Sequence, residues 1–277
     1  MSLRANIEFA IGEELKGEVC GTGLITTVSG QQYFLKSGAA SRTYQCEANG
    51  LRELAKANAI RVAKVVSVDE YYILTEYVRR GDPSLDFHRN FGYQFAQMHR
   101  YQGTSYGFYE DNYIGGNEQL NLPHDSERTD WAAFYFNKRL LYQYKLAEKQ
   151  GYISAVLKSG FLKLASRIEE ILRQSIEAPT LLHGDLWAGN YLCDEQGKVV
   201  LIDPAVYYGH READLAMTKV FGGFSSAFYE AYMEAYPLPE GWEYRESLYK
   251  LYHILNHLNL FGRSYLSEAE FLVHIYY

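Results

Sequence analysis

The sequence is poor in cysteine, in proline and in positive charge. It has 3 Cys and 6 Pro in 277 residues, and 27 Lys and Arg against 34 Asp and Glu give a net charge of −7. Cys20, Cys46 and Cys193 form no C-x-x-C pair, and their odd number argues against a disulfide framework, so we expect a reducing, cytoplasmic setting. The acidic balance, without a basic cluster, argues against nucleic acid and anionic membranes as partners.

Long apolar runs are also missing. No segment approaches the roughly 20 consecutive apolar residues that a membrane-spanning helix needs. Glu8, Glu13 and Glu14 interrupt the N-terminal stretch, which therefore does not resemble a secretory signal. Apolar residues make up 47% of the chain and charged residues 22%, and these shares are typical of a folded globular protein. The length favours one large domain or two modest ones.

The first 80 residues alternate glycine-containing turns with β-rich runs. Gly21 and Gly23 mark one turn, and Ser29-Gly30 marks another. The strand-like runs lie at residues 24–28, 32–36, 61–68 and 71–78, after a first short strand before Gly21. A helical stretch at 41–58 separates the early runs from the late ones. We therefore predict a small antiparallel sheet with one helix.

The segment Arg79-Arg80-Gly81-Asp82-Pro83 ends this pattern. It divides the chain into a predicted N-terminal lobe, residues 1–80, and a larger C-terminal lobe, residues 81–277. The second lobe is mostly helical, apart from a long irregular segment at 103–128 and a β-rich island at 180–202. Its predicted helices span 84–101, 129–150, 154–175, 211–221, 225–235 and 244–266.

The β-rich island carries the densest group of polar residues. Asp185 and Asn190 lie five residues apart in a turn between two apolar strands, and Asp203 ends the next strand. A hairpin would bring the three side chains to one end of the island. Their oxygen atoms suit a hard cation such as Mg²⁺, which would neutralise a polyphosphate, while Asp185 could accept a proton from an attacking hydroxyl. The alternative is a surface turn with an Asx cap and an unrelated aspartate.

This pattern resembles the protein-kinase catalytic loop, H-x-D-L-x-x-x-N, followed by a metal-binding aspartate. Gly184 after His183, and Asp203-Pro204-Ala205 in place of D-F-G, are closer to the small-molecule kinases of the same fold, the aminoglycoside- and choline-kinase-like group. The resemblance implies a bilobal, α+β, protein-kinase-like fold that uses ATP and Mg²⁺. Asp185 would be the catalytic base, and Asn190 and Asp203 the metal ligands.

The N-terminal lobe offers the residues that such a kinase needs for ATP. Lys36 ends a strand and would contact the phosphates, and Glu47 on the following helix could hold it, although Glu53 lies on the same helix. Gly21 and Gly23 would form the turn over the phosphates, or an ordinary hairpin turn. Glu76 and Val78 fall where the connection between the lobes should contact adenine.

The match to one family is closer. The stretches 203–217, 183–190, 221–224, 252–262 and 107–115 together resemble the fructosamine-kinase, or ketosamine 3-kinase, family over essentially the whole chain. This resemblance implies ATP-dependent phosphorylation of the 3-hydroxyl of ketoamines, the sugar–amine adducts such as fructosamines and ribulosamines. The unstable 3-phosphate would then release the sugar and repair the glycated amine or glycated lysine.

The substrate residues are more open. Trp187 could stack on the sugar or pack in the core, Asn112 could contact substrate or form a turn, and His257, with its neighbours Asn256 and Asn259, could bind the sugar or make internal hydrogen bonds. Arg211 and Asp214 are candidates for an ion pair that fixes the catalytic loop, and His99 for a packed core histidine. Cys20 adjoins the glycine turn, where a buried, inert thiol is the expectation and oxidative control the alternative.

Two other functions compete with this interpretation. The chain could phosphorylate another small molecule, such as choline or an aminoglycoside, or it could be a nucleotide-binding pseudokinase scaffold. Intact Asp185, Asn190, Asp203 and Lys36 argue against the scaffold. The preferred sugar and the choice between monomer and homodimer stay open.

Overall fold

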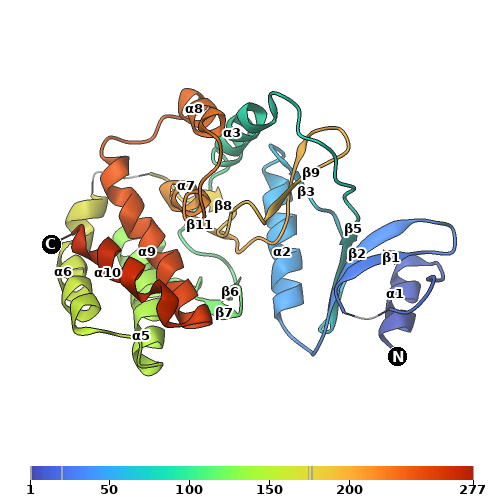
Figure 1. Ribbon diagram of the computed structural model, residues 1–277, viewed down its shortest axis with the longest axis horizontal. Helices are drawn as coiled ribbons and strands as arrows, with labels where there is room; N and C mark the ends of the chain where they lie inside the picture. The colour runs from blue at the N-terminus through green and yellow to red at the C-terminus, as the bar shows by residue number, and fades with distance from the viewer. Residues whose placement is uncertain (1, 20, 174, 176, 277) are drawn as a thin grey trace.

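The computed structural model describes residues 2–19, 21–173, 175 and 177–276, and Cys20 lies outside them. Two lobes lie side by side, a sheet with two helices on the right of Figure 1 and a larger helical lobe on the left. The predicted boundary after Arg80 lies in the segment between the last strand of that sheet and the first helix of the larger lobe. In the described ranges, no helix has both the length and the apolar character needed to cross a bilayer.

The sheet of the N-terminal lobe has four antiparallel strands in the order β1-β2-β5-β4. These are β1 (Gly23–Thr26), β2 (Gln32–Ser37), β5 (Tyr72–Glu76) and β4 (Val65–Val68). Successive side chains of a strand point to opposite faces. Leu74 packs with Leu35 on one face, while Ile73 packs on the other against Leu51 of α2 (Thr43–Lys56). This helix lies between the sheet and the C-terminal lobe (Figure 1).

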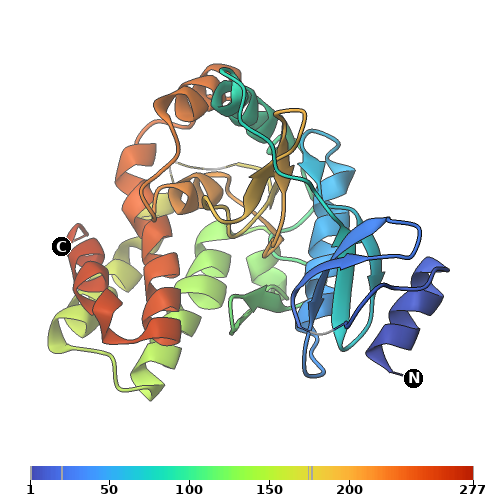
Figure 2. The ribbon, with the colours of Figure 1, turned by 45° about the vertical axis from the view of Figure 1, so that its right-hand side comes forward.

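The N-terminal lobe has one helix more than predicted. Helix α1 (Leu3–Ile11) starts with Ser2 as its cap, ends at the left-handed Gly12, and buries Ile7 against residues of the sheet. The helix lies beside the sheet, on the side away from the C-terminal lobe (Figure 2). The helix has only a narrow apolar stripe, which is a weak signal in the sequence, and the stripe is buried only because it packs on the sheet. The short strand expected before Gly21 is reduced to a bridge between Leu15 and Thr27.

The run at 61–68 divides between the lobes. Its first part, β3 (Arg61–Val62), pairs in parallel with β10 (Val199–Leu201), which pairs in turn with β9 (Tyr191–Cys193). Its second part is β4, which forms the expected antiparallel hairpin with β5. The sheet β3-β10-β9 therefore contains strands from both lobes and joins them.

Each helix predicted for the C-terminal lobe is present, with shifted ends. They are α3 (Phe87–Met98), α4 (Trp131–Tyr135) and α5 (Tyr142–Lys149) joined by a π-helical turn (Phe136–Leu141), α6 (Ala155–Leu172), α7 (Glu212–Thr218), α8 (Ser226–Ala235) and α9 (Trp242–Phe261). The last prediction, 244–266, ran too far, because the backbone turns at Gly262, and a 3₁₀ turn (Arg263–Tyr265) leads into α10 (Leu266–His274).

The segment 103–128 is more ordered than predicted. It contains the hairpin of β6 (Asn112–Ile114) and β7 (Asn117–Gln119) and a 3₁₀ turn (Asp125–Arg128). The three-residue strands carry too little periodicity to be recognised from sequence. A second short pair of antiparallel strands, β8 (Thr180–Leu182) and β11 (Tyr207–Gly209), lies on either side of the polar residues from Asp185 to Asp203 in the chain.

Candidate active site

The three polar residues of the island meet as predicted. The loop from His183 to Asn190 follows β8, and Asp203 follows β10. The Nδ2 of Asn190 donates to the backbone oxygen of Asp185 at 2.7 Å, to its Oδ2 at 3.1 Å and to the backbone oxygen of Asp203 at 3.4 Å. One amide thus connects the candidate base to the segment that carries the candidate metal ligand.

Asp214 on α7 holds this loop in place through hydrogen bonds to its backbone. Its carboxylate accepts hydrogen bonds from the backbone N–H groups of His183, at 2.7 Å, and Gly184, at 2.8 Å, and Oδ2 lies 3.2 Å from Nε2 of His99. His99 is fully buried, as predicted. The predicted ion pair with Arg211 is wrong, because the guanidinium of Arg211 lies 2.8 Å from Glu177 instead. Asp214 instead binds the backbone N–H groups of His183 and Gly184, and residue types alone cannot predict such backbone partners.

His183 also holds the loop through its ring. Its Nε2 donates to the carbonyl of Ile202 at 3.0 Å, while Nδ1 faces the N–H of Asp185 at 3.3 Å. Burial lowers the pKa of both His99 and His183, so both rings are neutral near pH 7. The ring of His183 therefore connects the start of the catalytic loop to the strand that precedes Asp203.

The glycine after His183 has a steric cause. Gly184 has φ of +83°, a region that side chains disfavour, and a Cβ placed there would lie 1.9 Å from the carbonyl oxygen of Ala205. Here the catalytic loop and the segment after Asp203 pack backbone against backbone, with the N–H of Ala205 donating to the carbonyl of His183 at 2.9 Å. The departure from the protein-kinase pattern at this position follows from that close approach.

The environment of Asp185 suits a general base. Burial raises the pKa of its carboxyl to about 8, against the opposing hydrogen bond from Asn190, and the carboxylates of Asp203 and Asp214 act in the same direction as burial. A carboxylate whose pKa is raised toward neutrality accepts a proton more readily than an ordinary aspartate.

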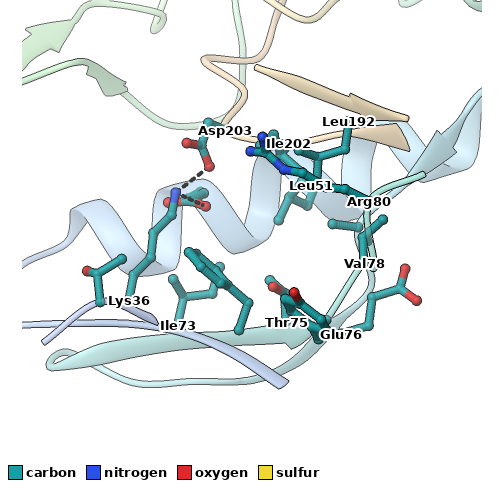
Figure 3. Close-up of a pocket in the computed structure, with 15 residues that line it drawn as sticks. Lys36, Leu51, Ile73, Thr75, Glu76, Val78, Arg80, Leu192, Ile202 and Asp203 are labelled. Carbon is teal, nitrogen blue, oxygen red and sulfur yellow. Dashed lines mark hydrogen bonds and ion pairs between the residues drawn. The ribbon is translucent and has the colours of Figure 1, made fainter. Parts of the chain in front are cut away.

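Lys36 reaches across from the N-terminal lobe to Asp203. Its Nζ lies 2.8 Å from Glu47 Oε1 and also forms an ion pair with Asp203 Oδ1 (Figure 3). Burial acts to lower the pKa of Lys36, but the two carboxylates outweigh it and raise that pKa. Burial raises the pKa of Glu47 to about 7, against the attraction of Lys36. Glu53 points elsewhere, to Lys56 and to the hydroxyl of Tyr208.

A cavity of about 300 Å³ opens beside this ion pair, between the sheet and β9–β10. Its walls include Glu76 and Val78, for which adenine contact is predicted, together with Arg80, which the sequence did not single out (Figure 3). Thr22 also lines it, while Gly21 and Gly23 flank Thr22 in the chain, and the carbonyl of Gly21 accepts from Ser37. The glycine turn therefore lies at the edge of this cavity.

The side-chain oxygen atoms at this site fit a metal ion that takes its remaining ligands from phosphate groups and water. Asn190 and Asp203 offer an amide oxygen and a carboxylate, and in the described part of the chain no group of three or more His, Cys, Asp or Glu residues could hold a metal ion by itself. Mg²⁺ prefers such a partial shell, because phosphate oxygens and water complete its octahedron. When bound there, the ion would neutralise phosphate charge.

A second cavity, of about 320 Å³, is lined by Asp185 and Asn190 and adjoins the first at Lys36, Glu47 and Asp203. Trp187 lines it with 38% of its surface exposed, so the ring is not a core residue. Phe221 lies edge-on to Trp187 at 5.8 Å between ring centroids, and His257 lies 4.8 Å from Phe221. An aromatic row therefore leads from the catalytic loop to α9.

Other predicted substrate residues bond internally. Asn112 lines the second cavity, but it is 3% exposed, and its Nδ2 donates to the carbonyl of Val206 at 2.8 Å. Asn256 and Asn259 are buried and bond to Gln143 rather than to each other. In His257, Nδ1 faces the carbonyl of His253 at 2.8 Å.

Comparison with known proteins identifies the family. The family model for fructosamine kinase matches residues 4–276. This chain belongs to the fructosamine kinase family. It is 37% identical over 270 residues to a chloroplastic protein-ribulosamine 3-kinase of Arabidopsis thaliana, covering 92% of this chain and 81% of that protein. The family and its relatives are kinases, which confirms the predicted class of enzyme.

Solved structures confirm the kinase-like fold. A protein described as a fructosamine-3-kinase of Thermobifida fusca superposes with a TM-score of 0.88 at 30% identity, over 99% of this chain and 98% of that one. An aminoglycoside phosphotransferase in complex with ADP and hygromycin B gives a TM-score of 0.64 at 12% identity, over 99% of both chains. This second likeness shows the fold alone.

Proposed function

We propose that this fructosamine kinase family member transfers the γ-phosphoryl group of ATP to the 3-hydroxyl of a ketoamine, with Asp185 as the base. The observation that supports this most directly is that the Lys36–Asp203 ion pair lines both cavities, while Asp185 and Trp187 line the second one beside it. The kinship to a protein-ribulosamine 3-kinase supports the choice of acceptor.

ATP occupies the first cavity in this proposal. Adenine lies against the backbone from Glu76 to Val78, the turn at Gly21 and Gly23 covers the phosphates, and Lys36, held by Glu47, contacts them. Asn190 and Asp203 hold Mg²⁺. Lys36 is already oriented by two carboxylates, so little ordering is needed when the nucleotide binds.

The ketoamine occupies the second cavity. Asp185 accepts the proton of the sugar 3-hydroxyl, the hydroxyl oxygen bonds to the γ-phosphorus, and the bond between that phosphorus and the β–γ bridging oxygen breaks to release ADP. Trp187 offers a partly exposed ring to the sugar or to the ammonium group, and His257, proposed as a further substrate residue, is connected to that ring through Phe221. We exclude Asn112 from the substrate contacts, since its amide is engaged by the protein.

The test is ADP release from Mg²⁺-ATP with fructoselysine or ribuloselysine, and with choline and an aminoglycoside as competing acceptors. We expect turnover with a ketoamine, a 3-phosphate visible by phosphorus NMR, and a loss of at least about 1,000-fold in kcat for Asp185→Asn, since an amide cannot accept the proton. Asp86→Asn, which changes an exposed aspartate, is the control. Turnover with choline or the aminoglycoside alone would refute the acceptor, and nucleotide binding without any turnover would favour a scaffold.

A cytoplasmic location and a monomeric or homodimeric state remain part of the proposal. Both are predictions from composition and resemblance. Fractionation of the producing cell and light scattering of the purified chain check them.

A further inference from the structure

Three buried amide side chains, two from the β6–β7 hairpin and one just after it, form a connected network beside the second cavity. Asn112 Oδ1 accepts from Gln119 Nε2 at 2.9 Å and from Asn121 Nδ2 at 2.8 Å. All three side chains are at most 3% exposed. Buried amides are costly unless they are satisfied, so the bonds that they make outside the network indicate what the network holds.

The network is anchored on two sides. Arg139, in the π-helical turn, donates to Asn121 Oδ1 at 2.7 Å and to the carbonyl of Leu120, with its guanidinium 4.0 Å from the ring centre of Tyr207. The hydroxyl of Tyr252 on α9 donates to Gln119 Oε1 at 2.8 Å. Because this bond occupies the amide oxygen of Gln119, its Nε2 must face the opposite direction.

Of the three bonds that these amides donate to backbone carbonyls, one goes from Asn121 to Glu110 at 3.2 Å, and the other two end on the segment after Asp203. Gln119 Nε2 donates to the carbonyl of Ala205 at 2.9 Å, and Asn112 Nδ2 donates to the carbonyl of Val206 at 2.8 Å. From the other side, the N–H of Ala205 donates to the carbonyl of His183. Two residues after Asp203, the backbone is therefore held between the catalytic loop and the amide network.

Asp203 itself has a backbone conformation that needs such support. Its φ is +52°, and apart from Asn58 it is the one non-glycine residue with positive φ in the described ranges. This conformation is disfavoured for a residue with a side chain, and it persists when the surroundings over-determine it. The segment would relax toward ordinary backbone angles, and move the carboxylate, if its anchors were lost.

We propose that the network of Asn112, Gln119 and Asn121 positions Asp203 for the metal ion, so that loosening it weakens nucleotide binding only where binding depends on Mg²⁺. This inference rests on the proposed function, because it takes Asp203 as a metal ligand. None of the three amides touches the reacting groups, and all act through the backbone at Ala205 and Val206. Asn112, predicted to contact substrate, is thereby a positioning residue.

The test compares Gln119→Leu with Asn259→Leu. Both changes remove a buried amide from the C-terminal lobe, but Asn259 bonds to Gln143 and not to the segment after Asp203. The probe is a non-hydrolysable ATP analogue titrated by calorimetry, once with excess Mg²⁺ and once with EDTA. We expect Gln119→Leu to lower the ratio of the two affinities by about 10-fold, the cost typical of losing a partner that orients a metal ligand, and Asn259→Leu to leave it unchanged.

A second pair of variants removes single oxygen atoms in case Gln119→Leu does not fold. Tyr252→Phe takes away the donor to Gln119, and Tyr249→Phe removes an equally buried hydroxyl of the same helix that accepts from Trp131. We expect the Mg²⁺ to EDTA ratio to fall by about threefold in Tyr252→Phe, the cost of one hydrogen bond, and to stay unchanged in Tyr249→Phe.

The outcomes separate the two proposals. If wild-type binding depends on Mg²⁺ but folded Gln119→Leu and Tyr252→Phe retain the wild-type ratio, the positioning role is refuted and the proposed function stands. An equal loss in Asn259→Leu also refutes it, since the effect would then be general. If wild-type binding is the same in Mg²⁺ and EDTA, the metal role of Asp203 is refuted, and the inference is refuted with it.

Discussion

The two halves of the active site are built differently. On the side of the catalytic loop, backbone packs against backbone, and Gly184 has a carbonyl oxygen where its Cβ would be. On the nucleotide side, Gly21 and Gly23 have open space around them, and the functional contact is an ion pair of partly exposed side chains. If the proposed function holds, the catalytic half is fixed before any ligand binds, while the nucleotide half has room to close over phosphates.

The catalytic half should tolerate substitution least. Gly184→Ala adds a Cβ that collides with the carbonyl of Ala205 and forces a side chain into left-handed backbone, so we expect a loss of about 4 kcal/mol or more in the free energy of unfolding. Urea unfolding, or the yield of folded protein, measures this loss. Wild-type stability in this variant would show that the loop can move away from Ala205.

Removing the anchor of the loop should have the next largest effect. Asp214→Asn replaces one of two acceptor oxygens by an N–H₂ group that faces backbone donors, and we expect a loss of about 3 kcal/mol in the free energy of unfolding at pH 7. Turnover should fall with it, because the backbone that carries Asp185 loses its support. Unfolding curves and kcat for the same preparation measure both effects.

The stability lost in Asp214→Asn should also depend on pH. Burial opposes ionisation of Asp214, but the hydrogen bonds that it accepts from His99 and from the N–H of Gly184 outweigh burial and lower its pKa. The ionised group therefore stabilises the fold above the ordinary aspartate pKa of about 4, and this stabilisation is lost as the pH falls below that value. The difference between wild type and Asp214→Asn should be constant from pH 7 to 5 and narrow below pH 4. A difference that is independent of pH down to 3 would contradict this account.

On the nucleotide side, function should change more than stability. Lys36→Met removes the partner of Glu47 and Asp203, but the pair is partly exposed, and Glu47, with a pKa near 7, can take up a proton. We expect less than about 1 kcal/mol lost in unfolding, and kcat/KM lower by about 100-fold or more. The readouts are thermal unfolding and ADP release, and a stability loss equal to that of Asp214→Asn would remove the contrast between the two halves.

The smallest effect on stability is expected in the glycine turn. Gly23 has ordinary backbone angles and nothing within 4 Å of the position of a Cβ, so Gly23→Ala should change the free energy of unfolding by less than about 0.5 kcal/mol. Chemical unfolding measures this change, and calorimetry with the ATP analogue shows whether the added methyl group hinders phosphate binding. A loss above about 1 kcal/mol would mean that the turn is packed as tightly as the catalytic loop.

From local spacing and periodic apolar residues, the sequence by itself predicted two lobes and the helices of the C-terminal lobe. The kinase-like fold and the roles of the kinase motifs were predicted from the resemblance to known kinases. Asp185, Asn190 and Asp203 converge because a turn and a hairpin separate them, and Lys36 meets Glu47 because strand and helix follow each other. The structure added α1 and the β6–β7 hairpin, which were not predicted, and it ended α9 earlier than predicted. These features give only short or narrow patterns of apolar residues in the sequence.

Only the tertiary structure decided which polar residues hold others in place. Asp214 accepts hydrogen bonds from backbone N–H groups and does not pair with Arg211, and Asn112 donates to the backbone after Asp203. A glycine is required at position 184 because the carbonyl of Ala205, 21 residues further along the chain, leaves no space for a Cβ. The physical reason is that such partners are backbone atoms, which every residue type carries. A hydrogen bond to them leaves no trace in spacing or composition, and it exists only once the fold has brought the two segments together.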